Sequence, residues 1–198
     1  PVRDQWLVLT QYDTPDGKIV ARRIWLYGRG SGRTALLLSF GAAGRSPAQA
    51  LPVGATIDAE LTPYPGGGQL RAELGEQFGA TTAAGPPPGI AAAAAPAVYG
   101  NALRDDPWLD AWPVTLRDVI PVPSKDGWQL ADAHADTHAE THADAHADAH
   151  AFTRADARTG SALPIAPAAL SRPGLWKLVA LSGGGPVTVF GEIGHRGF

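Results

Sequence analysis

Residues 5–28 read QWLVLTQYDTPDGKIVARRIWLYG and have the pattern of two strands around a turn. Two segments rich in β-branched and aromatic residues, 5–12 and 18–28, flank the sequence DTPDG, in which Pro15 and Gly17 are turn residues. A strand, a tight turn and a second strand in this order predict a β-hairpin. We therefore expect a fold that is built on antiparallel strands.

Further strands are predicted in the rest of the N-terminal part. The apolar run TALLLSF at 34–40 follows a glycine-rich turn and has the character of a buried strand. Apolar and acidic residues alternate with period two over 55–64, and 69–74 follows a PGGG turn as the expected hairpin partner. Residues 1–78 are thus predicted to form an N-terminal antiparallel β-module of about five strands.

The second half of the chain is expected to begin with a linker and a helix. Residues 79–97 are rich in proline and alanine, which predicts a semi-rigid linker. Residues 98–112 then place apolar side chains near helical spacing and predict one short helical segment. The remainder of 98–198 is expected to be a C-terminal β-module, and its predicted strands are 114–122, 127–132, 174–181 and 186–193.

The glycines of 182–185 are expected to join the last two predicted strands as a hairpin, and the six tryptophans to anchor the cores. The chain has 24 glycines and 18 prolines among 198 residues, which favours turns and short strands over long helices. The predicted fold class is mainly β, a β-rich α+β arrangement of two small antiparallel sheets or partly open barrels with one short helical segment between them.

The composition narrows the classes of function. The chain has no cysteine, which excludes disulfides and thiolate metal sites. Its net charge is −3, but residues 132–150 hold five of the 19 acidic residues and no lysine or arginine. The rest of the chain is therefore close to neutral and attracts nucleic acid little. No apolar run is long enough to cross a bilayer and no signal peptide is evident, so we expect a cytoplasmic protein without membrane contact. Because the chain starts with Pro1 and lacks methionine, we expect it to be part of a longer protein.

Residues 132–160 form a low-complexity insertion of His, Ala and Asp between two predicted strands. A histidine recurs at every fourth position of this ladder: His134, His138, His142, His146 and His150. On a helix, two neighbouring imidazoles share a face and can hold one Zn²⁺ or Ni²⁺, but weakly, because a structural zinc has four ligands. Three interpretations stay open: a repeat expansion, favoured by the regular four-residue unit, a weak metal site, and a pH-responsive segment.

The glycine-rich stretch GRGSGRT at 28–34 superficially resembles a phosphate-binding loop. A phosphate-binding loop needs a second glycine five residues after the first, followed by lysine, but Arg33 stands at that position and no lysine follows. The stretch is therefore predicted to be a hairpin turn.

Four arginines lie on or beside the second predicted strand: Arg22, Arg23, Arg29 and Arg33. With Trp25 and Tyr27 between them, they form a candidate platform for single-stranded nucleic acid or another anion. The alternative, which we favour, is that Trp25 is a core residue and the arginines form a solvated edge that blocks strand addition.

Glu192 and His195 form a closely spaced acid–histidine pair outside the ladder, and Arg196 follows them. These residues are candidate metal ligands, an acid–base pair or an anion site. The chain has no cysteine nucleophile and no Gly-x-Ser-x-Gly elbow, so we do not expect an enzyme.

Several long phrases carry a family resemblance. They include RDQWLVLTQYDTPDGKIVARRIWLYG, DDPWLDAWPV and LWKLVALSGGGPVTVFGEIGHRGF, and they fall within residues 1–78, 98–131 and 174–198. These phrases resemble the C-terminal region of actinobacterial SWIM zinc-finger family proteins. The resemblance implies a parent protein that binds DNA or other proteins, with zinc in a Cys-x-Cys and Cys-x-His finger. This chain lacks that finger, so no zinc ligand carries over to its residues, and the histidine-rich insertion departs from the family pattern.

The sequence thus predicts a non-catalytic interaction module of a SWIM zinc-finger type protein that binds another protein or nucleic acid. The alternative function is divalent-metal binding, with weak zinc or nickel affinity, through the ladder from His134 to His150. We expect no other cofactor on this chain.

Overall fold

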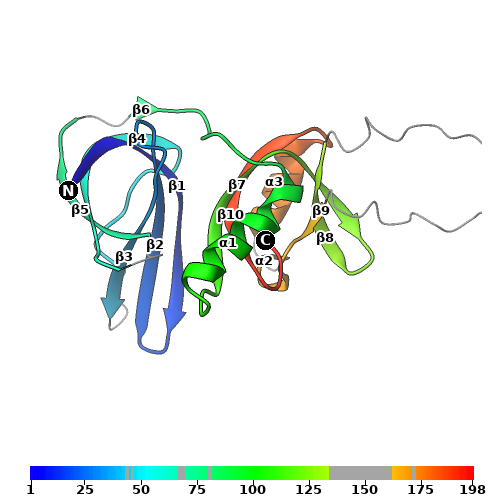
Figure 1. Cartoon of the computed structure of the whole chain (residues 1–198), viewed down its shortest axis with the longest axis horizontal. Coiled ribbons are helices and arrows are strands. Elements are labelled where there is room, and N and C mark those ends of the chain that lie inside the picture. The colour runs from blue at the N-terminus through cyan, green and yellow to red at the C-terminus, as the bar shows by residue number, and fades with distance from the viewer. Residues whose placement is uncertain (43–44, 46, 67–69, 80–81, 134–161, 171–172) are drawn as a thin grey trace, which may run out of the picture. The chain divides into compact units, whose positions relative to one another are not determined.

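A computed structural model of the chain describes residues 1–42, 45, 47–66, 70–79, 82–133, 162–170 and 173–198 (Figure 1). The chain divides into two units. Unit 1 comprises Pro1–Pro88 and Asn101–Leu109, and unit 2 comprises Gly89–Gly100 and Asp110–Phe198. Each unit contains one β-sheet, and the helix α1 (Ala95–Asp105) lies between the two sheets in the sequence. The predicted fold class, β-rich with two sheets and a short helix between them, is therefore confirmed.

The sheet of unit 1 closes on itself. Its strands are β1 (Val2–Asp16), β2 (Ile19–Gly28), β3 (Thr34–Ala42), β4 (Ala55–Pro63), β5 (Arg71–Gln77) and the short β6 (Thr82–Ala83). They follow the order β1-β2-β3-β5-β4-β6, and an additional pairing of β1 with β4 joins the first five into a barrel. All neighbours are antiparallel except β3 and β5, which are parallel. The order β4-β1-β2-β3 is a Greek key, and a five-stranded Greek-key barrel has the layout of the OB-fold.

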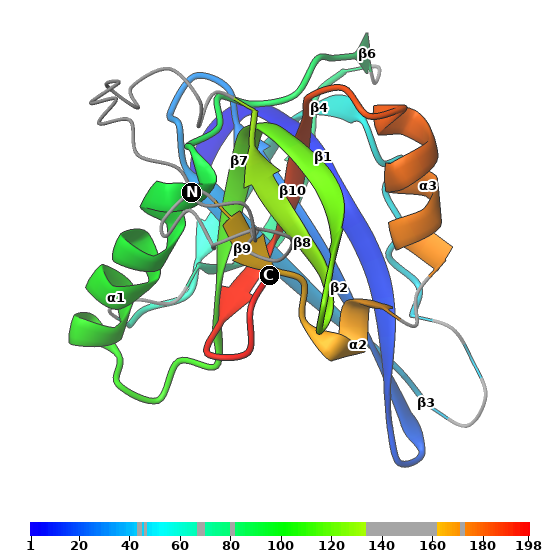
Figure 2. The same cartoon turned by 90° about the vertical axis from the view of Figure 1, so that its right-hand side faces the viewer.

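The long strand β1 makes this closure possible, and Figure 2 shows it as a curved blue strand. Residues Val2–Leu7 pair with β4, whereas Trp6–Asp16 pair with β2. An irregularity between Val8 and Thr10 interrupts the register with β2, and a bulge at such a point bends a strand. The strand can therefore serve two partners that lie in different directions.

Two side-chain interactions hold β1 against β4. The buried Trp6 Nε1 donates to the Ala59 carbonyl at 3.1 Å. The Arg3 guanidinium donates to both carboxylate oxygens of Asp58, at 2.9 and 3.0 Å. Two parallel bonds of this kind fix the relative position of the strands as well as their charges.

Alternate residues of the barrel strands form the core of unit 1, as the period-two pattern predicts. The buried members of this cluster are Trp6, Val8, Ile24, Leu26, Ala35, Leu37, Ile57, Ala59, Leu61 and Ala72. The predicted hairpin of β1 and β2 is confirmed, with Asp16 opposite Ile19 across a two-residue turn. Gly17 in that turn has φ +58°, a conformation that tight hairpins require and glycine adopts without strain.

Unit 2 contains a four-stranded antiparallel sheet. Its strands are β7 (Ala111–Ser124), β8 (Gly127–Asp132), β9 (Ala162–Pro164) and β10 (Val187–Gly194), in the order β10-β7-β8-β9. The first part of β7 pairs with β10 and its last part pairs with β8. The register with β10 shifts next to Asp118, which has φ +53°, so β7 also changes partner at a bulge.

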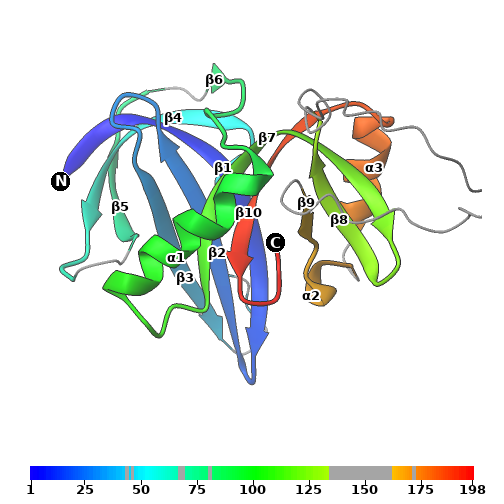
Figure 3. The ribbon, with the colours of Figure 1, turned by 45° about the vertical axis from the view of Figure 1, so that its right-hand side comes forward.

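The last residues of the chain turn back toward β9, as Figure 3 shows. Gly194 and Gly197 exchange backbone hydrogen bonds at 2.9 and 3.1 Å, which closes a tight turn. Phe198 N–H then donates to the Pro164 carbonyl at 2.9 Å, and the Phe198 carbonyl accepts from Ala166 N–H at 2.8 Å. The C-terminal turn thus connects β10 with the chain that follows β9.

Residues 79–97, predicted as a linker, contribute to both units. Strand β6 pairs with β4 in unit 1. Beyond Pro88, the short 3₁₀ helix η1 (Ala92–Ala94) leads into α1, and the Asp132 carboxylate accepts hydrogen bonds from Ala92 and Ala93 N–H at 2.6 and 3.0 Å. Ala92 is fully buried, so this part of the segment packs into unit 2.

The prediction of a strand at 174–181 is wrong, because these residues belong to the helix α3 (Pro173–Ser182). A second short helix, α2 (Pro167–Leu170), precedes it. Leu175 is buried and Leu178 is half-buried, whereas Trp176 and Leu181 are exposed, which is burial at helical spacing. An apolar run this short is compatible with either a strand or a buried helix, and packing decides between them.

The glycines at 182–185 do not form the predicted hairpin either. Gly183 and Gly184 have φ values of +53° and +86°, and Gly183 N–H donates to the Val179 carbonyl at 3.1 Å. This arrangement is typical of a helix end, where glycine adopts the left-handed conformation that other residues avoid.

The expectation that all six tryptophans anchor the cores holds only in part. Trp6 and Trp25 are buried, but Trp108 and Trp176 are 91 % and 63 % exposed. The Trp176 ring contacts Trp128 edge-on, with ring centroids 5.7 Å apart.

None of the helices in the described ranges is long and apolar enough to cross a membrane.

The helix at 173–182 predicts different effects for two matched substitutions. Leu175→Ala should lower the free energy of unfolding by about 2–4 kcal/mol because Leu175 is buried, while Leu181→Ala should change it by less than about 0.5 kcal/mol. Urea denaturation followed by circular dichroism measures both. In a strand the two leucines share a face, so equal losses would contradict the helix.

Candidate functional site

The glycine-rich stretch at 28–33 is the turn between β2 and β3, as predicted. Its backbone closes through Gly28 N–H to the Arg33 carbonyl and Gly32 N–H to the Gly28 carbonyl, both at 2.8 Å. The turn also binds a negatively charged group, which is a carboxylate of the same chain. The Asp4 carboxylate accepts hydrogen bonds from Gly30 and Ser31 N–H, each at 2.8 Å. The donors that a phosphate would use are therefore already engaged by Asp4 of β1.

Close packing around Asp4 explains the glycine at position 28. A Cβ atom at Gly28 would lie 2.5 Å from both Asp4 Oδ2 and Ser31 Oγ. Burial raises the pKa of Asp4, but hydrogen bonds from the Ser31 side chain and from the backbone of Gly30, Ser31 and Gln5 outweigh it and hold this pKa below its usual value. Asp4 is thus held as a carboxylate that fastens β1 to the β2–β3 turn.

The predicted arginine platform is divided between the two faces of the sheet. In a strand, neighbouring side chains point to opposite faces, so Arg22 and Arg23 cannot act on the same surface. Arg22 lies on the face of the barrel core, in register with Asp13 and Ser39. Its guanidinium donates to Asp13 Oδ1 and Oδ2 at 2.7 and 2.9 Å.

Arg22 also reaches the loop that follows β3. Its Nη1 donates to the carbonyls of Pro47 and Gln49 at 3.2 and 3.0 Å, and its side chain is only 13 % exposed. These bonds use most of the donors of the guanidinium. Arg22 therefore ties β1, β2 and this loop together.

The other predicted arginines lie apart from Arg22. Arg29 Nη2 donates to the Gly85 carbonyl at 3.1 Å, next to the chain segment that follows β6. Arg33 is exposed and lines a cavity. Trp25, which sequence reasoning offered either as a stacking residue or as a core residue, is 4 % exposed and belongs to the buried residues.

The outer face of β1, β2 and β3 carries an exposed apolar surface. Cross-strand pairing places Tyr12, Arg23 and Leu38 in one row and Thr14, Ala21 and Phe40 in the next, and directly opposed residues share a face. Ile19 is next along β2 on this face. We call these seven residues the outer patch. Phe40 is 60 % exposed and Ile19 is 45 % exposed.

Sequence reasoning missed the outer patch apart from Arg23. The signal that would have found it is the register of the predicted hairpin, because counting outward from the turn pairs Asp13 with Arg22 and Tyr12 with Arg23. Alternation then separates the two faces. The pairing of Ala21 with Phe40 also needs the β2–β3 register, which the sequence does not fix.

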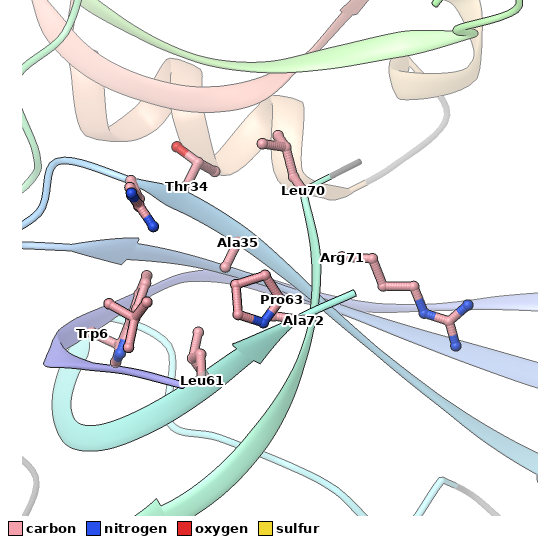
Figure 4. A pocket seen from close by; sticks show the side chains of 10 residues that line it. Trp6, Thr34, Ala35, Leu61, Pro63, Leu70, Arg71 and Ala72 are labelled. Carbon is pink, nitrogen blue, oxygen red and sulfur yellow. The ribbon is translucent and has the colours of Figure 1, made fainter. Parts of the chain in front are cut away.

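A cavity of about 280 Å³ opens among the strand ends of the barrel (Figure 4). Its apolar lining consists of Val2, Trp6, Ala35, Leu61, Pro63, Leu70 and Ala72. The remaining lining residues are Arg33, Thr34 and Arg71. The Arg71 guanidinium lies 4.6 Å from the centroid of the Tyr64 ring and, in Figure 4, points away from Ala35 and Ala72. The volume is slightly below the range of about 300–1,000 Å³ that is typical of pockets for drug-sized ligands.

The predicted site at Glu192, His195 and Arg196 coincides with the C-terminal turn of unit 2. Glu192 lies on β10 opposite Pro113 and is partly buried. His195 and Arg196 are the exposed central residues of the turn between Gly194 and Gly197. The close approach of Gly197 to the Pro164 carbonyl, together with its φ of +113°, gives this turn a structural role.

The histidine ladder, His134 to His150, lies outside the described residues. Its first flanking residues belong to the sheet, because Asp132 ends β8 and Ala133 N–H donates to the Asp118 carbonyl at 2.8 Å. The first two residues of the insertion predicted at 132–160 are thus bound to the sheet, and 134–160 lie outside the described residues. Among the described residues, no three His, Cys, Asp or Glu side chains are placed to share a metal ion.

Comparisons with known proteins give no family. No protein-family model matches this chain, and no curated protein and no solved structure matches it significantly.

The internal binding of Asp4 predicts a pH-dependent stability. Asp4→Asn should lower the free energy of unfolding by about 1 kcal/mol at pH 7, because the amide has one acceptor oxygen where the carboxylate has two. The pKa of Asp4 is lower in the folded protein than in the unfolded chain, where it is near 4. The contribution of Asp4 to the free energy of unfolding is therefore complete above the unfolded pKa and is lost as the pH falls through the folded pKa. Wild type and variant should therefore converge once the pH lies below the folded pKa of Asp4.

Urea titrations between pH 2.5 and 7 measure this difference, and Glu73→Gln is the matched control. Glu73 is exposed on β5, and its substitution should leave the stability unchanged at every pH. A loss in Asp4→Asn that persists undiminished at the lowest pH would show that the carboxylate charge does not hold the turn.

Proposed function

We propose that this chain is a non-catalytic interaction module and that the barrel of unit 1 binds a protein partner through the outer patch. The observation that carries this proposal is the exposure of Phe40 and Ile19, at 60 % and 45 %, on one sheet face beside Arg23. Aromatic and arginine side chains are enriched at the centres of protein interfaces, where they contribute most of the binding energy.

The charge balance favours a protein partner over a polyanion. Unit 1 has equal numbers of basic and acidic residues. Arg22 is engaged with Asp13 on the opposite face of the sheet, so it adds no positive charge to the outer patch. A surface that binds by apolar burial needs no net charge, whereas affinity for nucleic acid depends on it.

Single-stranded nucleic acid is the second candidate, and the layout of the barrel supports it. Five-stranded barrels of the OB-fold bind oligonucleotides on the face of their second and third strands. The outer patch lies on this face and contains Tyr12, Phe40 and Arg23, the residue types on which bases stack.

We also infer that the chain comes from a cytoplasmic SWIM zinc-finger type protein. The long phrases within residues 1–78, 98–131 and 174–198 support this origin. Zinc would then be held by the Cys and His finger of the parent protein. A metal-binding role of the ladder at 134–150 remains the alternative function, and its test is a zinc titration of the chain with and without residues 134–151.

Substitutions within and outside the patch test the proposal. The intact chain is purified from its native cells, and the proteins that co-purify specifically are measured. Phe40→Ser should reduce their amount about tenfold or more relative to the wild type, because the substitution removes an aromatic side chain from the interface. Val53→Ser is the control, since Val53 is 58 % exposed but lies in the loop before β4. Quantitative mass spectrometry measures the partners, and deletion of residues 134–151 should leave them bound.

Titration of a labelled twelve-residue oligothymidine tests the second candidate. Binding that weakens with salt and is lost in Phe40→Ser would favour nucleic acid over a protein partner. The proposal fails if every co-purifying partner is retained by Phe40→Ser and the oligonucleotide does not bind.

A further inference from the structure

Strand β3 is paired along its whole length on one side and along only part of its length on the other. It pairs with β2 along its whole length, from Tyr27 opposite Thr34 to Ile19 opposite Ala42. Its pairing with β5 consists of Leu36 opposite Arg71 and Leu37 opposite Ala72. Within the described part of the chain, residues 38–42 therefore have no strand beside them on the β5 side.

The backbone of Phe40 is directed toward this open edge. Leu36 N–H donates to the Leu70 carbonyl at 2.8 Å, so Leu36 directs its backbone groups to the β5 side. Alternate residues of a strand direct these groups to the same side, which gives Phe40 the same direction as Leu36. No strand in the described ranges pairs with its N–H and C=O, so both groups can bond to a further strand.

The open edge has no charged side chain, proline or bulge, three features that normally prevent strand addition. Natural edge strands are protected by charged side chains, proline, bulges or short length. Residues 38–42 read LSFGA, without charge or proline, and their register with β2 is regular. By contrast, β5 carries Glu73 and Glu76. The Phe40 side chain, 60 % exposed, lies beside the open edge and offers an apolar contact to an incoming strand.

We propose that a partner protein binds here by adding an extended peptide segment to the open edge of β3. The segment pairs its backbone with residues 38–42, and one of its apolar side chains packs against Phe40 on the outer face. Main-chain hydrogen bonds then provide affinity and the side-chain contact provides selectivity. This inference rests on the proposed function, because it specifies how the partner engages the outer patch.

A peptide fits this edge better than a second copy of the chain. Five residues provide only a few backbone hydrogen bonds, and a stable dimer needs a buried area on the order of 1,000 Å² or more. A short extended segment requires no larger surface than the edge and Phe40 provide.

An NMR titration with an alternating valine–threonine octapeptide tests the proposal on the intact chain. The peptide should shift the backbone amide signals of residues 38–42 and of facing residues in β2 saturably, with a Kd below about 1 mM. A second peptide with N-methyl groups on alternate amides should bind at least about tenfold more weakly, because it cannot donate those hydrogen bonds.

Two variants of Phe40 separate the backbone from the ring. Phe40→Pro removes the N–H on the open edge, where proline is tolerated, and should weaken binding of the octapeptide at least about tenfold. Phe40→Thr retains the N–H and should weaken it less. Val53→Thr, outside the patch, should bind like the wild type.

The proposal is overturned if the N-methylated peptide binds as tightly as the parent peptide, or if the octapeptide causes no saturable shifts in residues 38–42. It is also overturned if the wild type is a dimer that Phe40→Pro converts to a monomer, since a second copy would then occupy the edge. Phe40→Ser could lose the native partners while both peptides bind the wild type equally well. This result would mean that the outer patch is an interface but that the partner does not bind by strand addition.

Discussion

The barrel of unit 1 depends on one strand that pairs with two others. The first residues of β1 bond to β4 and the remainder bonds to β2, with an irregularity near Val8 that allows the change of direction. Without the β1–β4 pairing the sheet would be open, and the core around Ile57 and Leu61 would face solvent on one side. Unit 2 applies the same solution in β7, which leaves β10 for β8 beside Asp118. In both units a long strand thus changes partner at a bulge, and in unit 1 this change closes the barrel.

Alternation along these strands determines which residues lie on the core face and which on the outer face. Arg22 and Arg23 are adjacent in the sequence, yet one is fixed on the core face by Asp13 and the other lies on the outer face beside Phe40. The glycine-rich turn shows a similar internal use of chemistry, because Asp4 occupies the N–H groups of Gly30 and Ser31. Arg22 and the glycine-rich turn thus stabilise the barrel, whereas Phe40 and Ile19 keep apolar side chains exposed on the outer face.

Local signals were sufficient for much of the fold. The hairpin around Gly17 and the strands at 34–40 and 55–64 follow from turn residues and period-two patterning, which depend on neighbours in the sequence. The helix at 173–182 did not follow, because its short apolar run has no polar face to reveal the period. The parallel contact of Leu36 with Arg71 and the closure onto β4 join residues far apart in the sequence, and no local pattern encodes them. The outer patch was missed for the same reason, since it requires the register of three strands.

Barrel closure depends on the pairing of β1 with β4, and interstrand nuclear Overhauser effects detect this pairing. The structure predicts contacts from Val2 to Leu61 and from Asp4 to Ala59, together with contacts from Trp6 to Gly28 in the same sample. Antiparallel neighbours bring these backbones within about 4.5–5.5 Å, which is close enough for such contacts to be observed. Contacts from β1 to β2 alone, with none to β4, would mean an open sheet and would contradict the barrel, its core and the edge of β3 that the barrel leaves free.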